Sequence, residues 1–208
     1  MRGKFITLEG TEGVGKSTNI ECIEEWLARR DIEFISTREP GGTELGEEIR
    51  ALLLNHRAQS VDVMAELLLM FAARAQHLSE KILPALNNGV WVLCDRFTDA
   101  TFAYQGGGRG IDTTLIQTLA DLVHRDLQPD LTLVLDIDPQ IGLARIQKRG
   151  DRDRFETEEI EFFERVRLGY QAQMARQPER FRLIDASQSL SKVAAEINMV
   201  LDKFANQK

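Results

Sequence analysis

The chain has 208 residues, of which 28% are charged and 43% are hydrophobic, a balance typical of a soluble globular domain. Lysine and arginine number 26 against 33 acidic residues, so the formal net charge is −7. This balance argues against a protein that coats nucleic acid, and we expect no nucleic-acid partner. No apolar stretch is long enough for a signal peptide or a membrane span, so we expect a cytoplasmic protein with no membrane partner. The two cysteines are far apart and fit no metal-binding spacing, which predicts reduced thiols.

Residues 10–17 carry the first motif, which fits the phosphate-binding pattern G-x-x-x-x-G-K-[ST]. An apolar stretch at 4–8 predicts a strand before it, and a helical pattern begins at Ser17. The backbone N–H groups of such a P-loop and the N-terminus of its helix bind phosphate. Lys16 can reach the β- and γ-phosphates of a nucleotide, and the Ser17 hydroxyl can ligate Mg²⁺. An ordinary glycine turn is the alternative, but the flanking strand and helix favour the P-loop.

Strand and helix patterns alternate along the whole chain. Strands are predicted at residues 4–8, 32–36, 90–95, 131–137 and 181–184. Helices are predicted from residue 17, from 43 to 54, 61–86, 98–105, 113–123, from 138, 157–175 and 190–204. The glycine-rich residues 106–110 predict a flexible break, and Pro84 with residues 87–89 predicts the end of the third helix. The alternation predicts an α/β fold, a doubly wound parallel five-stranded sheet of the P-loop NTPase type with helices on both faces. We see no linker and expect one domain over residues 1–208.

Two of the predicted strands end in an aspartate, and ligands bind at the carboxyl ends of strands in such a sheet. Asp95 and Asp136 are therefore both candidates for the acidic residue beside a magnesium ion. Asp136 is followed by Asp138, which can cap the next helix, and is better interpreted as an acid that fixes a loop. We favour Asp95, although a local ion pair between Asp95 and Arg96 is the alternative interpretation.

The arginines fall into two groups. The first group comes from elements that can converge on an anionic acceptor: Arg38, Arg50, Arg74 and Arg96. The second, Arg149, Arg152 and Arg154, lies in a charged segment at about 147–157. A mobile lid of this composition can neutralise a phosphoryl group in transfer, whereas a solvated charged loop is the alternative. GTP-dependent switch proteins also contain a P-loop, but they recognise guanine with an Asn-Lys-x-Asp motif, which does not occur in this sequence. The distribution of the arginines also favours a kinase over such a switch.

The predicted helix at 61–86 is apolar over more than one face in its first half. Such a helix is either buried in the fold or pairs with a second subunit. We therefore expect a homodimer formed through this region.

Taken together, the motifs resemble those of bacterial thymidylate kinases, a family of P-loop nucleoside monophosphate kinases. The matching stretches cover essentially the whole chain, at residues 8–18, 38–43, 71–77, 95–97, 103–106 and 153–156. The resemblance implies transfer of the γ-phosphoryl group of ATP to dTMP, giving dTDP and ADP in dTTP biosynthesis. It also implies Mg²⁺ as cofactor and a homodimer.

The resemblance implies roles at matching positions. ATP binding is implied for Gly10, Thr11, Glu12, Gly13, Val14, Gly15, Lys16, Ser17, Thr18 and Arg145. The dTMP-binding positions are Glu39, Arg38, Arg50, Phe71, Arg74, Arg96, Thr101, Tyr104 and Gln105. The catalytic positions are Lys16, Glu12, Arg96, Asp95, Arg154 and Arg149, and the metal-binding positions are Ser17 and Asp95.

Within the acceptor site, Phe71 resembles the residue that stacks on thymine, although an aromatic residue on such a helix is commonly part of the core. Arg74, Gln105 and Thr101 resemble the polar contacts of the base, and Tyr104 would lie against the sugar. The implied grip on the acceptor phosphate is formed by Arg38, Arg50 and Arg96, with Glu12 orienting the arginine.

Two sequence details refine the resemblance. The P-loop carries Gly13 and no arginine, so the chain resembles the subgroup of the family whose lid supplies the catalytic arginine, here Arg154 or Arg149. Ala100 stands where many relatives have serine, so one polar contact near the base is absent. Adenine would lie near Arg145 and residues 186–188.

Three other functions remain open on the sequence alone. A different P-loop kinase for a nucleoside or another monophosphate would show a different acceptor preference. A nucleotide-binding switch or scaffold would bind ATP without transferring phosphate. A dimeric structural protein would explain residues 61–86 but would leave the P-loop without a role.

Overall fold

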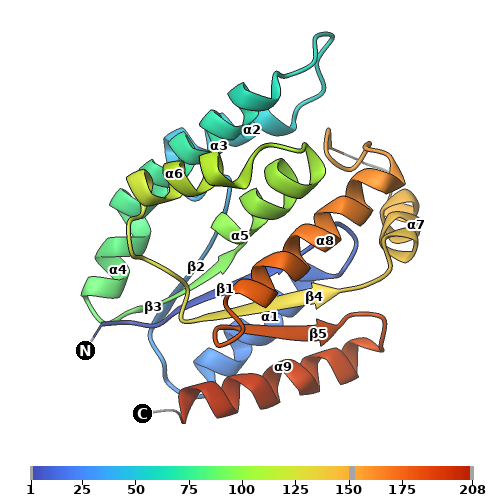
Figure 1. Cartoon of the computed structure of the whole chain (residues 1–208). Helices are drawn as coiled ribbons and strands as arrows, with labels where there is room; N and C mark the ends of the chain where they lie inside the picture. The colour runs from blue at the N-terminus through green and yellow to red at the C-terminus, as the bar shows by residue number, and fades with distance from the viewer. Residues whose placement is uncertain (1, 150–152, 207–208) are drawn as a thin grey trace.

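The computed structural model describes residues 2–149 and 153–206 (Figure 1). The strands are β1 (Phe5–Gly10), β2 (Phe34–Arg38), β3 (Trp91–Asp95), β4 (Leu131–Asp136) and β5 (Phe181–Asp185). All neighbouring strands run parallel, in the order β2-β3-β1-β4-β5. This arrangement confirms the predicted fold class and places β1, with the P-loop at its end, in the centre of the sheet.

Nine α-helices and two π-helical segments occur in the described ranges. They are α1 (Lys16–Ala28), α2 (Glu44–Leu54), α3 (Val63–His77), η1 (Leu78–Ile82), α4 (Leu83–Asn87), α5 (Thr98–Thr101), η2 (Phe102–Gly108), α6 (Thr113–Val123), α7 (Pro139–Arg149), α8 (Ile160–Arg176) and α9 (Leu190–Ala205). No described helix has the length and apolar character needed to cross a membrane.

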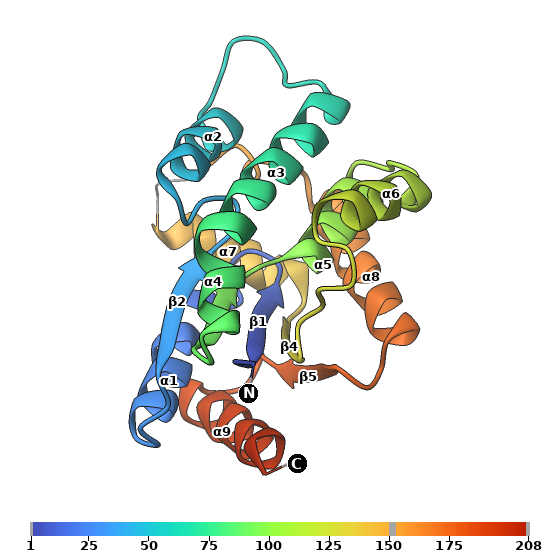
Figure 2. The same cartoon turned by 90° about the vertical axis from the view of Figure 1, so that its left-hand side faces the viewer.

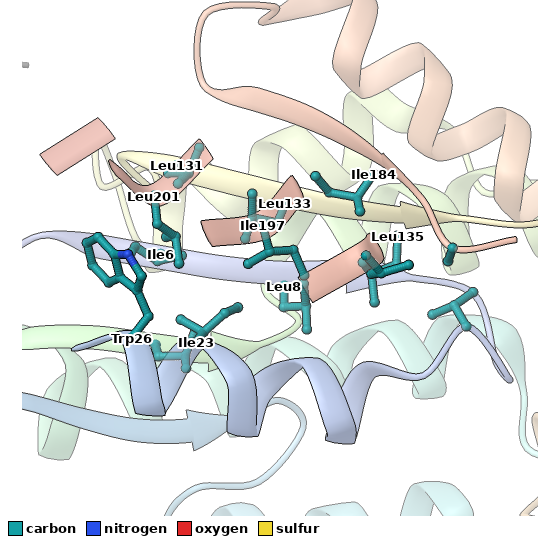
Figure 3. Close-up of a cluster of buried hydrophobic side chains, with 14 of the residues drawn as sticks. Ile6, Leu8, Ile23, Trp26, Leu131, Leu133, Leu135, Ile184, Ile197 and Leu201 are labelled. Carbon is teal, nitrogen blue, oxygen red and sulfur yellow. The ribbon is translucent and has the colours of Figure 1, made fainter. Parts of the chain in front are cut away.

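Helices cover both faces of the sheet, with α1 and α9 on one face and α4, α5 and α8 on the other (Figure 2). Because side chains alternate along a strand, Ile6 and Leu8 of β1 point to the first face. There they pack with Ile23 of α1 and with Ile197 and Leu201 of α9, all of them buried (Figure 3). Each such side chain contributes about 1.5–3 kcal/mol on burial, which fixes the central strand and the loop that follows it.

The predicted helix at 61–86 is one helical stretch with an internal change of geometry. The π-helical turn η1 separates α3 from α4, and Pro84 lies in the first turn of α4 rather than at a helix end. A proline inside a helix removes one backbone N–H and crowds the preceding turn, and here the preceding turn is the π-helical η1. The prediction that Pro84 helps to end the helix was therefore wrong, whereas the end near Asn87 is confirmed.

The predicted flexible break at 106–110 was also wrong over its first half, because η2 continues to Gly108. These glycines allow α8 to approach closely. A Cβ atom at Gly107 would lie 2.6 Å from the carbonyl oxygen of Arg165, and one at Gly108 would lie 2.5 Å from the ring of Phe162. The glycines therefore serve helix packing rather than chain flexibility.

Four smaller predictions from the sequence can also be compared with the structure. The second strand is shifted by two residues from the predicted 32–36, and α8 begins at Ile160 rather than at 157. The side chain of Asp138 accepts the N–H of Gln140 at 2.8 Å, as expected for a helix cap. Cys22 and Cys94 are both free, and Cys94 is buried.

Replacing Gly107 by alanine tests the close packing of η2 on α8. Because the new methyl group meets a backbone carbonyl, we expect Gly107→Ala to lower the free energy of unfolding by about 1–3 kcal/mol. Thermal unfolding followed by circular dichroism measures this loss. Gly106→Ala is the matched control, since its nearest neighbour is the movable Cδ1 atom of Ile116 at 3.3 Å. Equal melting temperatures for Gly107→Ala and the wild type would contradict the packing argument.

Candidate active site

The P-loop connects β1 to α1 through a turn whose backbone N–H groups can bind phosphate. Gly13 and Gly15 have φ angles of 73° and 89°, in the left-handed region that favours glycine. A Cβ atom at Gly13 would also lie 2.2 Å from the carbonyl oxygen of Gly142 in α7. The Lys16 ammonium donates to the carbonyls of Gly10 and Thr11 at 3.3 and 3.2 Å. Burial and the nearby Arg96 lower the pKa of Lys16.

A cavity of about 400 Å³ opens beside this loop, at the carboxyl edge of the sheet. Its lining contains most of the predicted site residues: Glu12, Gly13, Gly15, Lys16, Ser17, Thr18, Glu39, Arg50, Arg74, Asp95, Arg96, Thr101, Tyr104, Gln105 and Arg145. Ala100, the position predicted to lie near the base, also lines it. Six other predicted residues lie elsewhere in the described part of the chain: Gly10, Thr11, Val14, Arg38, Phe71 and Arg154.

Arg96 joins the end of β3 to the P-loop. One of its nitrogen atoms donates to the Glu12 carboxylate at 2.7 Å, and another donates to the Tyr170 hydroxyl at 3.1 Å. Its guanidinium group lies 4.6 Å from the ring centroid of Tyr104, whose hydroxyl also donates to Glu12. The carboxylate partner of Arg96 is thus Glu12 rather than the neighbouring Asp95.

The two strand-end aspartates differ in their surroundings. Both oxygens of Asp136 accept from the guanidinium of Arg167, at 2.7 and 2.6 Å. Asp95 lines the cavity, and its buried Oδ1 atom has no hydrogen-bond partner among the described residues. Asp136 therefore fixes a helix to the carboxyl edge of the sheet, whereas Asp95 lines the cavity and keeps one buried carboxylate oxygen without a partner among the described residues.

A buried chain of polar contacts forms the other end of the cavity. Arg74 donates to the Glu39 carboxylate at 2.7 Å and to the Thr101 hydroxyl at 3.0 Å. The second Glu39 oxygen contacts the His77 ring at 3.0 Å. Burial alone would raise the pKa of Glu39, but Arg74 and His77 outweigh it and lower this pKa. One buried nitrogen of Arg74, Nη1, has no partner among the described residues and is available to a ligand.

Glu66 of α3 organises the neighbouring contacts although it is almost fully buried. It accepts from the Gln105 amide at 2.9 Å, from Arg109 at 3.2 Å and from Arg154 at 2.6 Å. Arg154 also donates to the carbonyl of Leu53 at 2.8 Å. The lid arginine is therefore held by Glu66, outside the cavity lining.

The remaining predicted residues are placed as follows. Phe71 is 3% exposed and belongs to a core cluster with Leu67 and Phe102. Arg38 is exposed and pairs with Glu47 at 2.8 Å. Arg50 donates to the carbonyl of Pro40 at 2.9 Å. Arg149 ends α7, but its side chain falls outside the described residues, as do residues 150–152 of the lid with Arg152.

A second hollow lies on the other side of the P-loop, lined by Gly13, Arg145, Ala186 and Gln188 among others. Arg145 donates to the carbonyl of Gly13 at 3.3 Å. The predicted adenine region therefore borders the phosphate-binding turn. The described residues contain no group of three or more histidine, cysteine, aspartate or glutamate side chains that could hold a metal ion. A divalent cation would depend on a few protein ligands and on phosphate oxygens.

Four functional candidates were missed from the sequence: Glu9, Glu66, His77 and Tyr170. Each is a buried side chain that carries a polar group. A carboxylate in an apolar strand or helix, such as Glu9 or Glu66, is a signal that could have been used, because a buried charge requires a partner. The identity of each partner depends on tertiary contacts.

A parallel sheet with a P-loop at its central strand and arginines around the adjoining cavity defines a P-loop kinase. The family model described as Thymidylate kinase matches residues 8–197. The chain is 57% identical to the thymidylate kinase of Teredinibacter turnerae over 204 aligned residues, which make up 98% of this chain and 100% of that protein. It is 59% identical to that of Chromohalobacter salexigens over 197 residues, or 94% and 93% of the two chains.

A solved structure agrees with these relatives. The crystal structure of thymidylate kinase from Ehrlichia chaffeensis has a TM-score of 0.79 and 36% sequence identity, covering 97% of this chain and 99% of that one. The chain belongs to the thymidylate kinase family. This membership sets aside the alternatives of a nucleotide-binding switch and of a purely structural protein.

Proposed function

We propose that this dTMP kinase transfers the γ-phosphoryl group of ATP to the phosphate of dTMP within the cavity, giving dTDP and ADP in dTTP biosynthesis. The main observation that supports this proposal is the position of Arg96. Its guanidinium group lies beside the P-loop, where Glu12 and Tyr170 accept from it at 2.7 and 3.1 Å. An acceptor phosphate bound there would lie next to the phosphates of the donor, as phosphoryl transfer requires.

On the donor side, residues 10–18 would hold the phosphates of ATP through backbone N–H groups. The Lys16 ammonium, which now donates to two loop carbonyls, would turn to the β- and γ-phosphate oxygens. Arg145 and the hollow that it lines would receive the adenine.

On the acceptor side, Arg50 and Arg96 line the cavity and would grip the dTMP phosphate. Arg38 would join them after leaving its exposed ion pair with Glu47. An oxygen of the dTMP phosphate then forms a bond to the γ-phosphorus of ATP. The bond from that phosphorus to the β,γ-bridging oxygen breaks, and ADP leaves with the electron pair.

At the base end, the free Nη1 atom of Arg74 and the polar groups of Gln105 and Thr101 would contact the edge of thymine. Glu39 would act by holding Arg74, and Tyr104 would lie against the sugar. Phe71 is buried, so its proposed stacking on the base requires a shift of its ring into the cavity. Stacking of this kind contributes about 1–3 kcal/mol.

Ser17 and Asp95 would hold Mg²⁺, which when bound neutralises charge on the transferred phosphates. The buried Oδ1 atom of Asp95, which lacks a partner among the described residues, fits such a ligand. A lid arginine, Arg149 or Arg154, would stabilise the remaining charge. Arg154 can take this role only after it leaves Glu66.

We further propose a homodimer formed through the α3 region. Val63, Met64 and Leu68 of α3 are exposed by 42%, 38% and 51%, as expected for a helix that is covered by a second copy of the chain. The two free cysteines suit a reducing compartment and support a cytoplasmic location. Residues 1–208 would act as one domain with a lid at about 147–157.

The proposed reaction predicts a strong preference for dTMP among phosphate acceptors. The measurement is ADP release from ATP and Mg²⁺ with dTMP, dUMP, dCMP, dGMP, AMP and thymidine. Because dUMP lacks only the methyl group of thymine, equal rates with dTMP and dUMP would contradict recognition of that group. Activity with thymidine alone would contradict the phosphate grip.

The metal role of Asp95 predicts that Asp95→Asn lowers the rate at saturating ATP and dTMP by about 10- to 100-fold and raises the Mg²⁺ requirement. Titration of activity with Mg²⁺ measures both effects. Asp136→Asn is the matched control, because Asp136 also ends a strand but is bound by Arg167. The proposal fails if the two variants have the same Mg²⁺ dependence.

The dimer proposal predicts that Leu68→Glu yields monomers at micromolar concentration, because it places a charge in an apolar interface. Sedimentation velocity measures the association state. Leu190→Glu is the control, since Leu190 is 63% exposed at the start of α9, away from α3. A wild-type chain that sediments as a monomer would refute the dimer.

A further inference from the structure

The carboxylate of Glu9 lies beneath the active site and is completely buried. It belongs to β1, immediately before the P-loop glycine Gly10. One of its oxygens accepts the backbone N–H of Phe97 at 2.7 Å, and the other accepts the hydroxyl of Tyr170 at 2.8 Å. Neither the reaction scheme nor the family motifs described above give this carboxylate a role.

Tyr170 of α8 links Glu9 to Arg96. Its hydroxyl donates to Glu9 and accepts from Arg96 at 3.1 Å, and the side chain is 2% exposed. Glu9 therefore acts on Arg96 from two directions. It holds the backbone of the next residue, Phe97, and through Tyr170 it holds the guanidinium group.

The backbone of Arg96 shows why such contacts are needed. Its φ angle is 69°, in the left-handed region that residues with a side chain rarely adopt. This conformation turns the chain at the end of β3, and Arg96 also contacts Glu12 of the P-loop. Surrounding contacts must therefore fix both the backbone and the side chain of this residue.

We propose that Glu9 and Tyr170 are positioning residues that set the Arg96 guanidinium for the acceptor phosphate. This inference rests on the proposed function, in which Arg96 binds the dTMP phosphate. Glu12 and the Tyr104 ring hold the guanidinium from the P-loop and from η2. Glu9 and Tyr170 supply the contact from beneath, so that the guanidinium is oriented before dTMP binds.

The principal test is Tyr170→Phe, which removes the hydroxyl and keeps the ring. We expect the KM for dTMP to rise about 10- to 100-fold, as for the loss of one hydrogen bond to a charged group, while the KM for ATP is unchanged. Thermal stability should fall in either case, because a buried oxygen of Glu9 loses its donor, but a merely structural role would change both KM values or neither. An unchanged KM for dTMP, or equal changes in both constants, would overturn the inference.

A second variant, Glu9→Gln, tests the carboxylate itself and keeps the test open if Tyr170→Phe does not fold. Burial, with Asp99 nearby, raises the pKa of Glu9 to about 8, so assays at about pH 9 keep this carboxyl largely ionised. The glutamine amide nitrogen would donate toward the Tyr170 hydroxyl and remove its acceptor. We expect a smaller rise in the KM for dTMP, and a value equal to that of the wild type would remove Glu9 from the inference.

The matched control is Thr7→Val, which removes a buried hydrogen bond of 2.8 Å to Thr132 from the same strand. It should lower thermal stability and leave both KM values unchanged. A rise in the KM for dTMP in this variant would overturn the inference, because any damage to β1 would then suffice.

Combination with Arg96→Ala separates this inference from the proposed function. If Arg96→Ala leaves the KM for dTMP unchanged, the phosphate grip fails, and the positioning role fails with it. If Arg96→Ala raises this KM but Tyr170→Phe does not, only the positioning inference fails. We expect Tyr170→Phe to have no further effect in the Arg96→Ala background, since coupled residues are non-additive.

Discussion

The active site depends on the ion pair between Arg96 and Glu12, which joins the end of β3 to the P-loop at 2.7 Å. Parallel strands bring these two segments to one edge of the sheet, and the side chains then fix them together. Because the pair is only partly exposed, solvent screens it less than a surface pair. The proposed donor and acceptor subsites thus have a defined relative position before any substrate binds.

Buried carboxylates extend this principle through the site. Glu39 and Glu66 lie in the interior, and each holds an arginine with hydrogen-bonding geometry. Each pair avoids an uncompensated buried charge. Glu39 leaves one buried nitrogen of Arg74, a residue that lines the cavity, without a partner among the described residues, whereas Glu66 holds Arg154 outside the cavity lining. The same physical requirement thus governs how both arginines are held.

The sequence was sufficient for the parts of the molecule that local pattern determines. The apolar strands, the P-loop and the carboxyl-edge position of Asp95 and Arg96 follow from hydrophobic runs and a fixed motif. The roles of residues 106–108 and the partner of Arg154 could not be predicted, because they depend on contacts between distant segments. At Gly107, for example, the backbone of α8 approaches so closely that a Cβ atom would lie 2.6 Å from the carbonyl oxygen of Arg165.

The central claim is that Arg96 recognises the phosphate of the acceptor. Isothermal titration calorimetry with dTMP and with thymidine, on the wild type and on Arg96→Ala, tests it most directly. The account predicts that the wild type binds dTMP much more tightly than thymidine and that Arg96→Ala loses most of this difference. An undiminished difference in Arg96→Ala would show that another group holds the phosphate and would contradict the account.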